Sequence, residues 1–272
     1  GSGYTGRWIY RSALKQSLAI LASSRRPDRH LSEVDPSRRV LFDLAEPSTW
    51  AALPPDADVI WTFPATPLEQ VQAFAQHYCR PPGRLVVLGS TSAYDREGAP
   101  LDGLPAWIDE AQLINTSLPR VRGEEYLRTH HGAIILRVAG IYGPDRNPVE
   151  WIRQGRVGPS NKFVNLIHVE DLAHLCLLAL QRGQAGDTYN VSDGHPRRWV
   201  DICDEVSGRW GVSSTRQADR NETGKRIRNY KILTQLGYTL QHPDFYEALR
   251  SIEADRQPPS DAEVSNARRS GS

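Results

Sequence analysis

Gly1-Ser2-Gly3-Tyr4-Thr5-Gly6 opens the chain and matches the pattern G-x-G-x-x-G. In this pattern the first glycine permits a tight turn, the second lets a phosphate approach the backbone, and the third allows close packing of helix against strand. The phosphates then lie on amides at the helix N-terminus, where the helix dipole favours negative charge. The motif predicts a dinucleotide-binding turn leading into a helix over residues 3–15. A flexible Gly-Ser start or a cloning scar is the alternative.

Two arginines follow the next apolar run, residues 18–23, in the stretch Ser23-Ser24-Arg25-Arg26. A strand at this place in a dinucleotide-binding fold often ends in an acidic residue that binds the ribose hydroxyls of NAD. Arg25 and Arg26 offer guanidinium groups instead, and these bind a 2′-phosphate well. The pair favours NADP over NAD, with a solvated basic turn as the alternative. Asp43 follows another short strand, 39–42, and either faces the adenine amine or is an ordinary turn residue.

Strand-like and helix-like segments alternate along the chain, which is typical of an α/β layer fold with a parallel sheet. Further strands are predicted at 58–63, 84–89, 133–138, 163–168 and 188–191, and helices at 68–77, 124–130, 170–181, 199–209 and 231–236. We therefore predict a Rossmann-type, doubly wound parallel sheet. The tail, 257–272, is rich in Pro, Ser, Asp and Arg and is predicted to be disordered.

The composition argues against several other classes of protein. The 272 residues are 39% hydrophobic with a formal net charge of +1, so no overall field recruits nucleic acid or an anionic membrane. The longest apolar stretch, 172–180, is broken by His174 and is too short to span a bilayer. Cys79, Cys176 and Cys203 are few and widely spaced, which indicates neither a disulfide framework nor a metal site. We expect a reduced, cytoplasmic protein.

At this point the chain resembles the extended short-chain dehydrogenase/reductase family, also called the NAD-dependent epimerase/dehydratase family. Several segments carry the likeness, and they occur in the family's order: Gly1–Gly6, Asp43-Leu44, Leu88–Tyr94, Trp107–Glu110, Leu136–Pro144, Ile167–Leu172 and Tyr189–Asp193. The stretches Gly224–Asn229 and Leu236-Gly237-Tyr238 resemble the ending of one atypical branch. The resemblance extends to about residue 253. Each motif alone is loose, but their ordered set is specific.

The resemblance implies a single NAD(P)-binding Rossmann domain over 1–256, with a small substrate lobe formed mainly by parts of 144–165 and 192–256. Ser90 takes the place of the hydroxyl that binds the reacting oxygen, with Thr91 and Ser92 as substitutes and backbone capping as the alternative role. The other implied cofactor contacts, beyond the glycine turn and the two arginines, are Asp43, Leu44, Phe63, Pro64, Ala65, Val138, Ala139 and Ile141.

The family's Tyr-x-x-x-Lys pair is missing from this sequence. Aligning Glu124 with the glutamate that follows the pair places Thr116 at the tyrosine and Arg120 at the lysine. Arg120 supplies a permanent positive charge and donors for a ribose, whereas threonine is a far weaker acid than a phenol. An alignment displaced by one residue would place Ser117 and Val121 there instead.

Three interpretations of this departure stay open. Tyr94 takes over proton transfer, or it packs under the substrate loop. His168 titrates in the right range, or it is a structural histidine beside the start of the next helix. Finally, the pocket performs no dehydrogenase chemistry, and cofactor binding is itself the signal.

A chain that starts at the glycine turn lacks the strand that precedes the turn in this fold. That strand is central to the sheet, and its loss would leave buried backbone groups of both neighbouring strands unpaired. We therefore predict about ten further residues upstream of Gly1 in the natural protein, an apolar strand among them.

Two functions remain in competition. The first is an NAD(P)-dependent oxidoreductase or epimerase/dehydratase that acts on a small hydroxyl- or carbonyl-bearing substrate. A sugar derivative is one such substrate. The second is a non-catalytic NADP-binding sensor or interaction protein. Arg146, Trp151, Arg197 and Trp199 form an anion or sugar site in the substrate lobe, or they are surface arginines and packing tryptophans. The resemblance leaves a homodimer open.

Overall fold

The computed structural model describes residues 1–78, 83–94, 104–216 and 224–256. Cys79 and the tail predicted to be disordered lie outside these ranges. Within them, no helix has the length and apolar character needed to cross a membrane.

Four parallel strands form the central sheet, in the order β10-β6-β4-β3. These are β3 (Val59–Trp61), β4 (Leu85–Ser90), β6 (Ile134–Val138) and β10 (Thr188–Val191). Every residue of β6 and β10 is buried, as expected for parallel strands covered on both faces. The predicted parallel sheet is confirmed.

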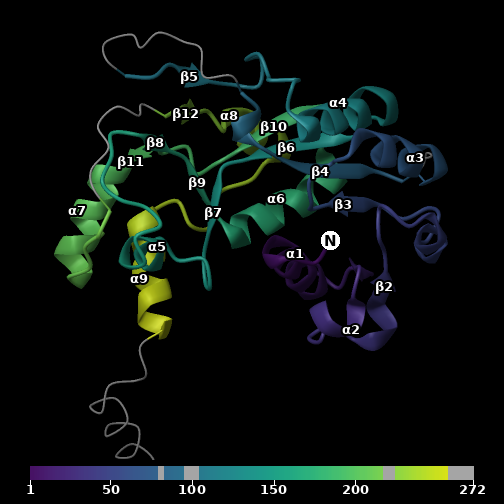
Figure 1. Cartoon of the computed structure of the whole chain (residues 1–272), viewed down its shortest axis with the longest axis horizontal. Helices are drawn as coiled ribbons and strands as arrows, with labels where there is room; N and C mark the ends of the chain where they lie inside the picture. The colour runs from purple at the N-terminus through teal and green to yellow at the C-terminus, as the bar shows by residue number, and fades with distance from the viewer. Residues whose placement is uncertain (79–82, 95–103, 217–223, 257–272) are drawn as a thin grey trace, which may run out of the picture.

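Helices cover both faces of this sheet (Figure 1). α1 (Tyr4–Lys15) packs beside α6 (Val169–Arg182) on one face, and α3 (Leu68–Tyr78) packs beside α4 (Pro119–His131) on the other. Successive strand residues alternate between the two layers, because side chains along a strand point to opposite faces. Val86 belongs to the core under α6, and Val87 belongs to the core under α3.

Two further strands form a separate parallel pair: β1 (Ala22–Ser24) with β2 (Arg39–Leu41). The short helix α2 (Pro27–His30) and the 3₁₀ turns η1 (Pro36–Arg38) and η2 (Pro47–Ala52) connect this part of the chain. Among the described strands, β1 pairs only with β2, and β3 pairs only with β4. β1 and β3 therefore each have one edge without a partner strand, and these edges border the space between the two sheets.

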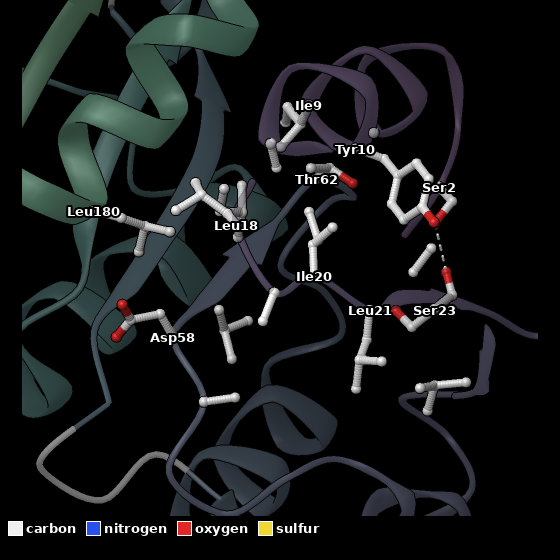
Figure 2. Close-up of a pocket in the computed structure, with 18 of the residues that line it drawn as sticks. Ser2, Ile9, Tyr10, Leu18, Ile20, Leu21, Ser23, Asp58, Thr62 and Leu180 are labelled. Atoms are coloured by element: carbon white, nitrogen blue, oxygen red, sulfur yellow. Dashed lines mark hydrogen bonds between the residues drawn. The ribbon is translucent and has the colours of Figure 1, made fainter. Parts of the chain in front are cut away.

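A largely apolar cavity of about 750 Å³ occupies that space. Figure 2 shows Leu18, Ile20 and Leu180 among the side chains around it. At one end Thr62 Oγ1 donates to the carbonyl of Gly1, while Ser2 Oγ donates to the carbonyl of Ser23 over 3.1 Å. The glycine turn thus bridges the carboxyl ends of β3 and β1.

The remaining elements form a smaller lobe beside the sheet (Figure 1). It contains three two-stranded pairs: β7 (Gly140–Tyr142) with β9 (Leu166–His168), β8 (Phe163–Val164) with β11 (Arg197–Arg198), and β5 (Trp107–Ile108) with β12 (Arg226–Ile227). Its helices are α5 (Pro148–Arg153), α7 (Trp199–Trp210) and α9 (Phe245–Arg256). The helix α8 (Tyr230–Leu236) packs against α6 and β10 instead, in the core of the central sheet. Trp199 and Phe245 are buried in the core of this lobe, so Trp199 is a packing residue.

We expect an apolar strand of about six residues joined directly before Gly1 to stabilise the protein, because it would pair with both open edges and fill the cavity. Each kcal/mol gained should raise the Tm by about 2–4 °C for a domain of this size. Thermal unfolding followed by circular dichroism compares this longer chain with one that carries an equally long Gly-Ser extension. Equal Tm values for the two would contradict the prediction.

Candidate active site at the carboxyl ends of the strands

The glycine turn is shaped by close contacts within its own backbone. A Cβ atom on Gly6 would collide with the carbonyl oxygen of Gly1, whereas a Cβ on Gly3 would have no atom within 4 Å. Gly3 is the N-cap of α1 and has no side chain to cover the amides of the first turn. The surface above the start of α1 therefore has room for a phosphate, and the helix dipole favours one there.

Tyr4 links this turn to the chain that enters the smaller lobe. Its hydroxyl donates to the carbonyl of Pro144 over 2.7 Å, and the guanidinium of Arg146 lies 5.4 Å from the centre of its ring. Thr5 follows in the first turn of α1. Arg146 is exposed, so its charge is placed beside the start of α1. This is the one residue of the suspected anion site that the structure brings to the glycine turn.

Arg25 and Arg26 directly follow β1 and are both exposed. The backbone amide of Arg26 donates to Ser24 Oγ over 3.1 Å, and that hydroxyl also lies 2.8 Å from His30 Nδ1. The turn is therefore held by its neighbours while the arginine side chains reach solvent. Neither guanidinium has an ion pair among the described residues.

The other residues assigned to the cofactor form two groups: one follows β2, and the other follows β3 or lies at the end of β6. Asp43 accepts a hydrogen bond from the amide of Ala45 over 3.0 Å, which makes it part of a local turn, and Leu44 is buried in the core under α3. Phe63, Pro64 and Ala65 follow β3, and Val138 ends β6 with Ala139 and Ile141 just beyond. Ala65, Val138 and Ala139 are buried, whereas Pro64 is exposed.

Ser90 ends β4 and pairs in register with Val138 of β6. Its Oγ accepts a hydrogen bond from the amide of Ser92 over 3.2 Å and so caps η3 (Thr91–Ala93). The two serine hydroxyl oxygens are 3.0 Å apart. Both serines stay at least partly exposed, so capping does not bury their hydroxyl groups.

Arg120 reaches this serine turn from the first turn of α4. Its Nη2 donates to Ser92 Oγ over 2.6 Å. Thr116 is exposed in the turn before α4, and Val121 is buried. Of the two alignments, the one that uses Thr116 and Arg120 brings a cation to the serines, and the displaced one would put a buried valine there.

Tyr94 is held in the interior by its neighbours. It is buried, its hydroxyl donates to Asn190 Oδ1 over 2.5 Å, and the guanidinium of Arg137 lies 4.8 Å from its ring centre. Burial raises the pKa of the Tyr94 hydroxyl. Both features disfavour proton exchange with a substrate in this arrangement.

His168 is also buried, and its Nδ1 accepts a hydrogen bond from the amide of Glu170 over 3.3 Å at the start of α6. Burial, aided by the nearby charge of His242, lowers the pKa of His168 to about 3. The ring is therefore neutral at physiological pH and caps the helix.

Glu124 is a functional candidate that the sequence supplied only as an alignment marker. It is 2% exposed, and a Cβ on Gly89 would come within 2.7 Å of its Oε2, so the backbone at Gly89 lies close over the carboxyl group. Arg120 Nη1 lies 3.8 Å from its Oε1. Burial raises the pKa of Glu124 to about 7, against the opposing effect of Arg120 and Arg137. The site thus contains one carboxyl that gains or loses a proton near neutral pH.

Lys225 joins the site from the smaller lobe. Its Nζ donates to the carbonyl of Thr91 over 3.2 Å and to the carbonyl of Tyr94. Asn165 fixes the same segment, because its side chain donates to the carbonyl of Lys225 over 2.8 Å and accepts from the amide of Ile227 over 2.9 Å. The motif Gly224–Asn229 marked this segment in the sequence but gave no sign of its target.

Comparison with curated proteins gives a partial match. No protein-family model matches the chain. Protein YeeZ of Escherichia coli (strain K12) is 29% identical over 168 residues, which span 59% of this chain and 59% of YeeZ. The match therefore covers less than two thirds of that relative's own length.

Solved structures match over most of the chain. A conserved protein of unknown function from Silicibacter pomeroyi DSS aligns with a TM-score of 0.74 at 23% identity, over 94% of this chain and 96% of that chain. MoeE5, solved with UDP-glucuronic acid and NAD, gives 0.73 at 16% identity, over 94% and 96%. DesIV from Streptomyces venezuelae, a dTDP-glucose 4,6-dehydratase solved as a double mutant with NAD and DAU, gives 0.73 at 18% identity, over 94% and 95%. The chain has the fold of the extended short-chain dehydrogenase/reductases, as the sequence resemblance predicts.

The titration of Glu124 should make stability depend on pH. The carboxyl ionises near pH 4.5 in the unfolded chain and near pH 7 in the folded protein, so the folded state holds the proton more tightly between these values. The free energy of unfolding should therefore fall as pH rises from about 4.5 to 7, by on the order of 3 kcal/mol.

Replacing Glu124 by glutamine removes this titration and should flatten that dependence. Urea unfolding between pH 4.5 and 8 measures it, with Glu69→Gln, an exposed position on α3, as the control that keeps the wild-type slope. An unchanged slope in Glu124→Gln would show that another group dominates.

Proposed function

We propose that this chain binds NADP, with NAD as the weaker alternative, as an atypical member of the extended short-chain dehydrogenase/reductase family. The observation that carries the proposal is the position of the glycine turn, which contacts Thr62 just after β3 in the central sheet and Ser23 in β1, the strand that leads into the exposed Arg25 and Arg26. Ligands of such sheets bind outside the carboxyl ends of the strands. The structural neighbours MoeE5 and DesIV hold NAD, which supports a nicotinamide dinucleotide.

In this proposal each group of residues has one part of the cofactor to hold. The amides at the start of α1 hold the pyrophosphate, and the open surface above Gly3 fits it. Arg25 and Arg26 bind the 2′-phosphate, and Asp43 lies toward the adenine. Phe63, Pro64 and Ala65 line one side of the cofactor, and Val138, Ala139 and Ile141 line the nicotinamide end.

The proposed activity is that of an oxidoreductase or epimerase/dehydratase on a small hydroxyl- or carbonyl-bearing substrate, with a sugar derivative as the first choice. When bound, the nicotinamide supplies hydride transfer. Ser90 orients the reacting oxygen, and Arg120 holds a positive charge beside it. Arginine does not release its proton near neutral pH, so Glu124 is the proposed group that holds a proton behind Arg120.

A second candidate function is a non-catalytic NADP-dependent sensor. The hydrogen bond of the Tyr94 hydroxyl to Asn190 favours it, because the one tyrosine near the serine turn is not free to exchange a proton with a substrate. Thr116 supplies no phenol in its place. Retained cofactor contacts with lost acid–base groups would suit a protein whose partners respond to NADP occupancy.

Calorimetric titration with NADPH and NADH tests the cofactor assignment. We expect tighter binding of NADPH, and a loss of about 10–100-fold in NADPH affinity for the double variant Arg25→Ala/Arg26→Ala, the size expected for lost charge-assisted hydrogen bonds. NADH affinity should change little. Arg29→Ala, an exposed arginine on α2, is the control. Absence of binding by either nucleotide would remove the central claim.

A panel of carbonyl compounds, followed by the loss of NADPH absorbance, separates the enzyme from the sensor. For an enzyme we expect turnover that falls about 100-fold in kcat when Ser90 is replaced by alanine, since one donor to a developing oxyanion has roughly that effect. NADPH affinity should stay unchanged in that variant. Tight NADPH binding without turnover of any compound in a broad panel would favour the sensor.

A further inference from the structure

Three side chains with metal-binding atoms meet where α6 begins. His168, Glu170 and His242 each offer one ligand atom, and these atoms all lie within 4.8 Å of one another. The two imidazole rings are 3.7 Å apart between centroids, and His242 Nε2 lies 3.1 Å from Glu170 Oε2. None of the three belongs to the proposed cofactor or substrate contacts, so the cluster needs an account of its own.

The fold fixes the His168 ring before any ligand arrives. The residue ends β9, is 4% exposed, and packs edge-on against the rings of Trp8 and Tyr142. Its Nδ1 accepts a hydrogen bond from the backbone amide of Glu170. The neutral ring therefore carries its proton on Nε2, and the Nδ1 lone pair is directed toward Glu170. That hydrogen bond is long, at 3.3 Å, and a metal ion could replace it at small cost.

His242 comes from a distant part of the chain, and Asp171 holds it in place. The Asp171 carboxylate is fully buried and accepts hydrogen bonds from the amides of Gln241 over 2.7 Å and His242 over 3.0 Å. It also accepts a hydrogen bond from the hydroxyl of Tyr238 over 2.7 Å. The loop is therefore pinned beside Glu170, which is the kind of support from neighbouring groups that orients metal ligands.

We propose that His168, Glu170 and His242 bind one divalent transition-metal ion of the zinc class. Two imidazole nitrogens and one carboxylate oxygen form a donor set that zinc accepts, with a fourth position for water. The side chains of His242 and Glu170 are 28% and 26% exposed, which leaves a route of entry and room for that water. Ligand atoms in a tetrahedral site are about 3.3 Å apart, so the exposed side chains need to close by roughly an ångström.

The local charge balance permits a cation here. The positive end of α6 and the nearby Lys15 oppose it, whereas the carboxylates of Glu170 and Asp171 favour it from the same turn. Bound there, the ion joins the Rossmann core, through α6, to the chain segment that leads into α9. The site is thus a clamp between the core and the substrate lobe.

The test uses the full 272-residue chain after treatment with a chelator. Co²⁺ is titrated while the visible absorption bands of four-coordinate cobalt are followed, and Zn²⁺ is then added to compete. We expect one ion per chain, an intense visible spectrum that Zn²⁺ abolishes, and a higher Tm with Zn²⁺. His242→Ala and Glu170→Gln should each weaken binding by at least about 100-fold, since each removes one of three ligands.

His195→Ala is the matched control, because His195 is an exposed histidine outside the cluster. It should bind Co²⁺ and Zn²⁺ like the wild type. Circular dichroism establishes that each variant is folded, and His168 is left intact because it is buried in the core. Two results would overturn the proposal: no saturable Zn²⁺ binding tighter than about 10 μM, or equal affinity in the wild type and His242→Ala. The cluster would then be a hydrogen-bonded helix cap only.

Discussion

The parallel pairing of β4 with β6 is the constraint on which the rest of the molecule depends. Their residues alternate between two helical layers, so each strand buries both faces, and a slip by one position would move every side chain into the opposite layer. Because both strands run the same way, their carboxyl ends meet at one edge, and Ser90 lies in register with Val138. The position of the candidate site follows from that register and not from any contact within the site.

The smaller lobe is fixed to this frame at two separate places. Lys225 donates to the carbonyls of Thr91 and Tyr94 beside the serine turn, and Asp171 holds the loop that precedes α9. Both are ionic side chains that bind backbone groups, and such hydrogen bonds exceed neutral ones in strength. The first tie acts on the candidate site directly. The second lies where β9 ends and α6 begins, so it sets the lobe's position without touching the serines.

Sequence patterns predicted the elements whose signal is local. The continuous apolar run at 133–138 gave β6 almost to the residue, and the apolar helix at 170–181 gave α6. The two-residue strands β5 and β12 were not predicted, because they exist only through pairing across the lobe. α9 was missed as well, since its buried face shows only against the lobe core. The direction of Tyr94 and the meeting of His242 with Glu170, 72 residues away, are likewise tertiary facts.

The substitution of the family's tyrosine and lysine separates two properties that one pair of residues normally combines. Arg120 supplies positive charge at the serine turn but cannot exchange its proton, whereas Glu124 exchanges a proton near pH 7 but lies beneath Gly89. In the proposed enzyme, a proton from Glu124 would pass to the substrate by movement of that side chain past the backbone or through water beside Arg120. An enzyme needs one of these events in every cycle. A sensor needs neither, because the neutral carboxyl then serves only to limit how strongly Arg120 is paired, and so leaves that cation available to the bound nucleotide.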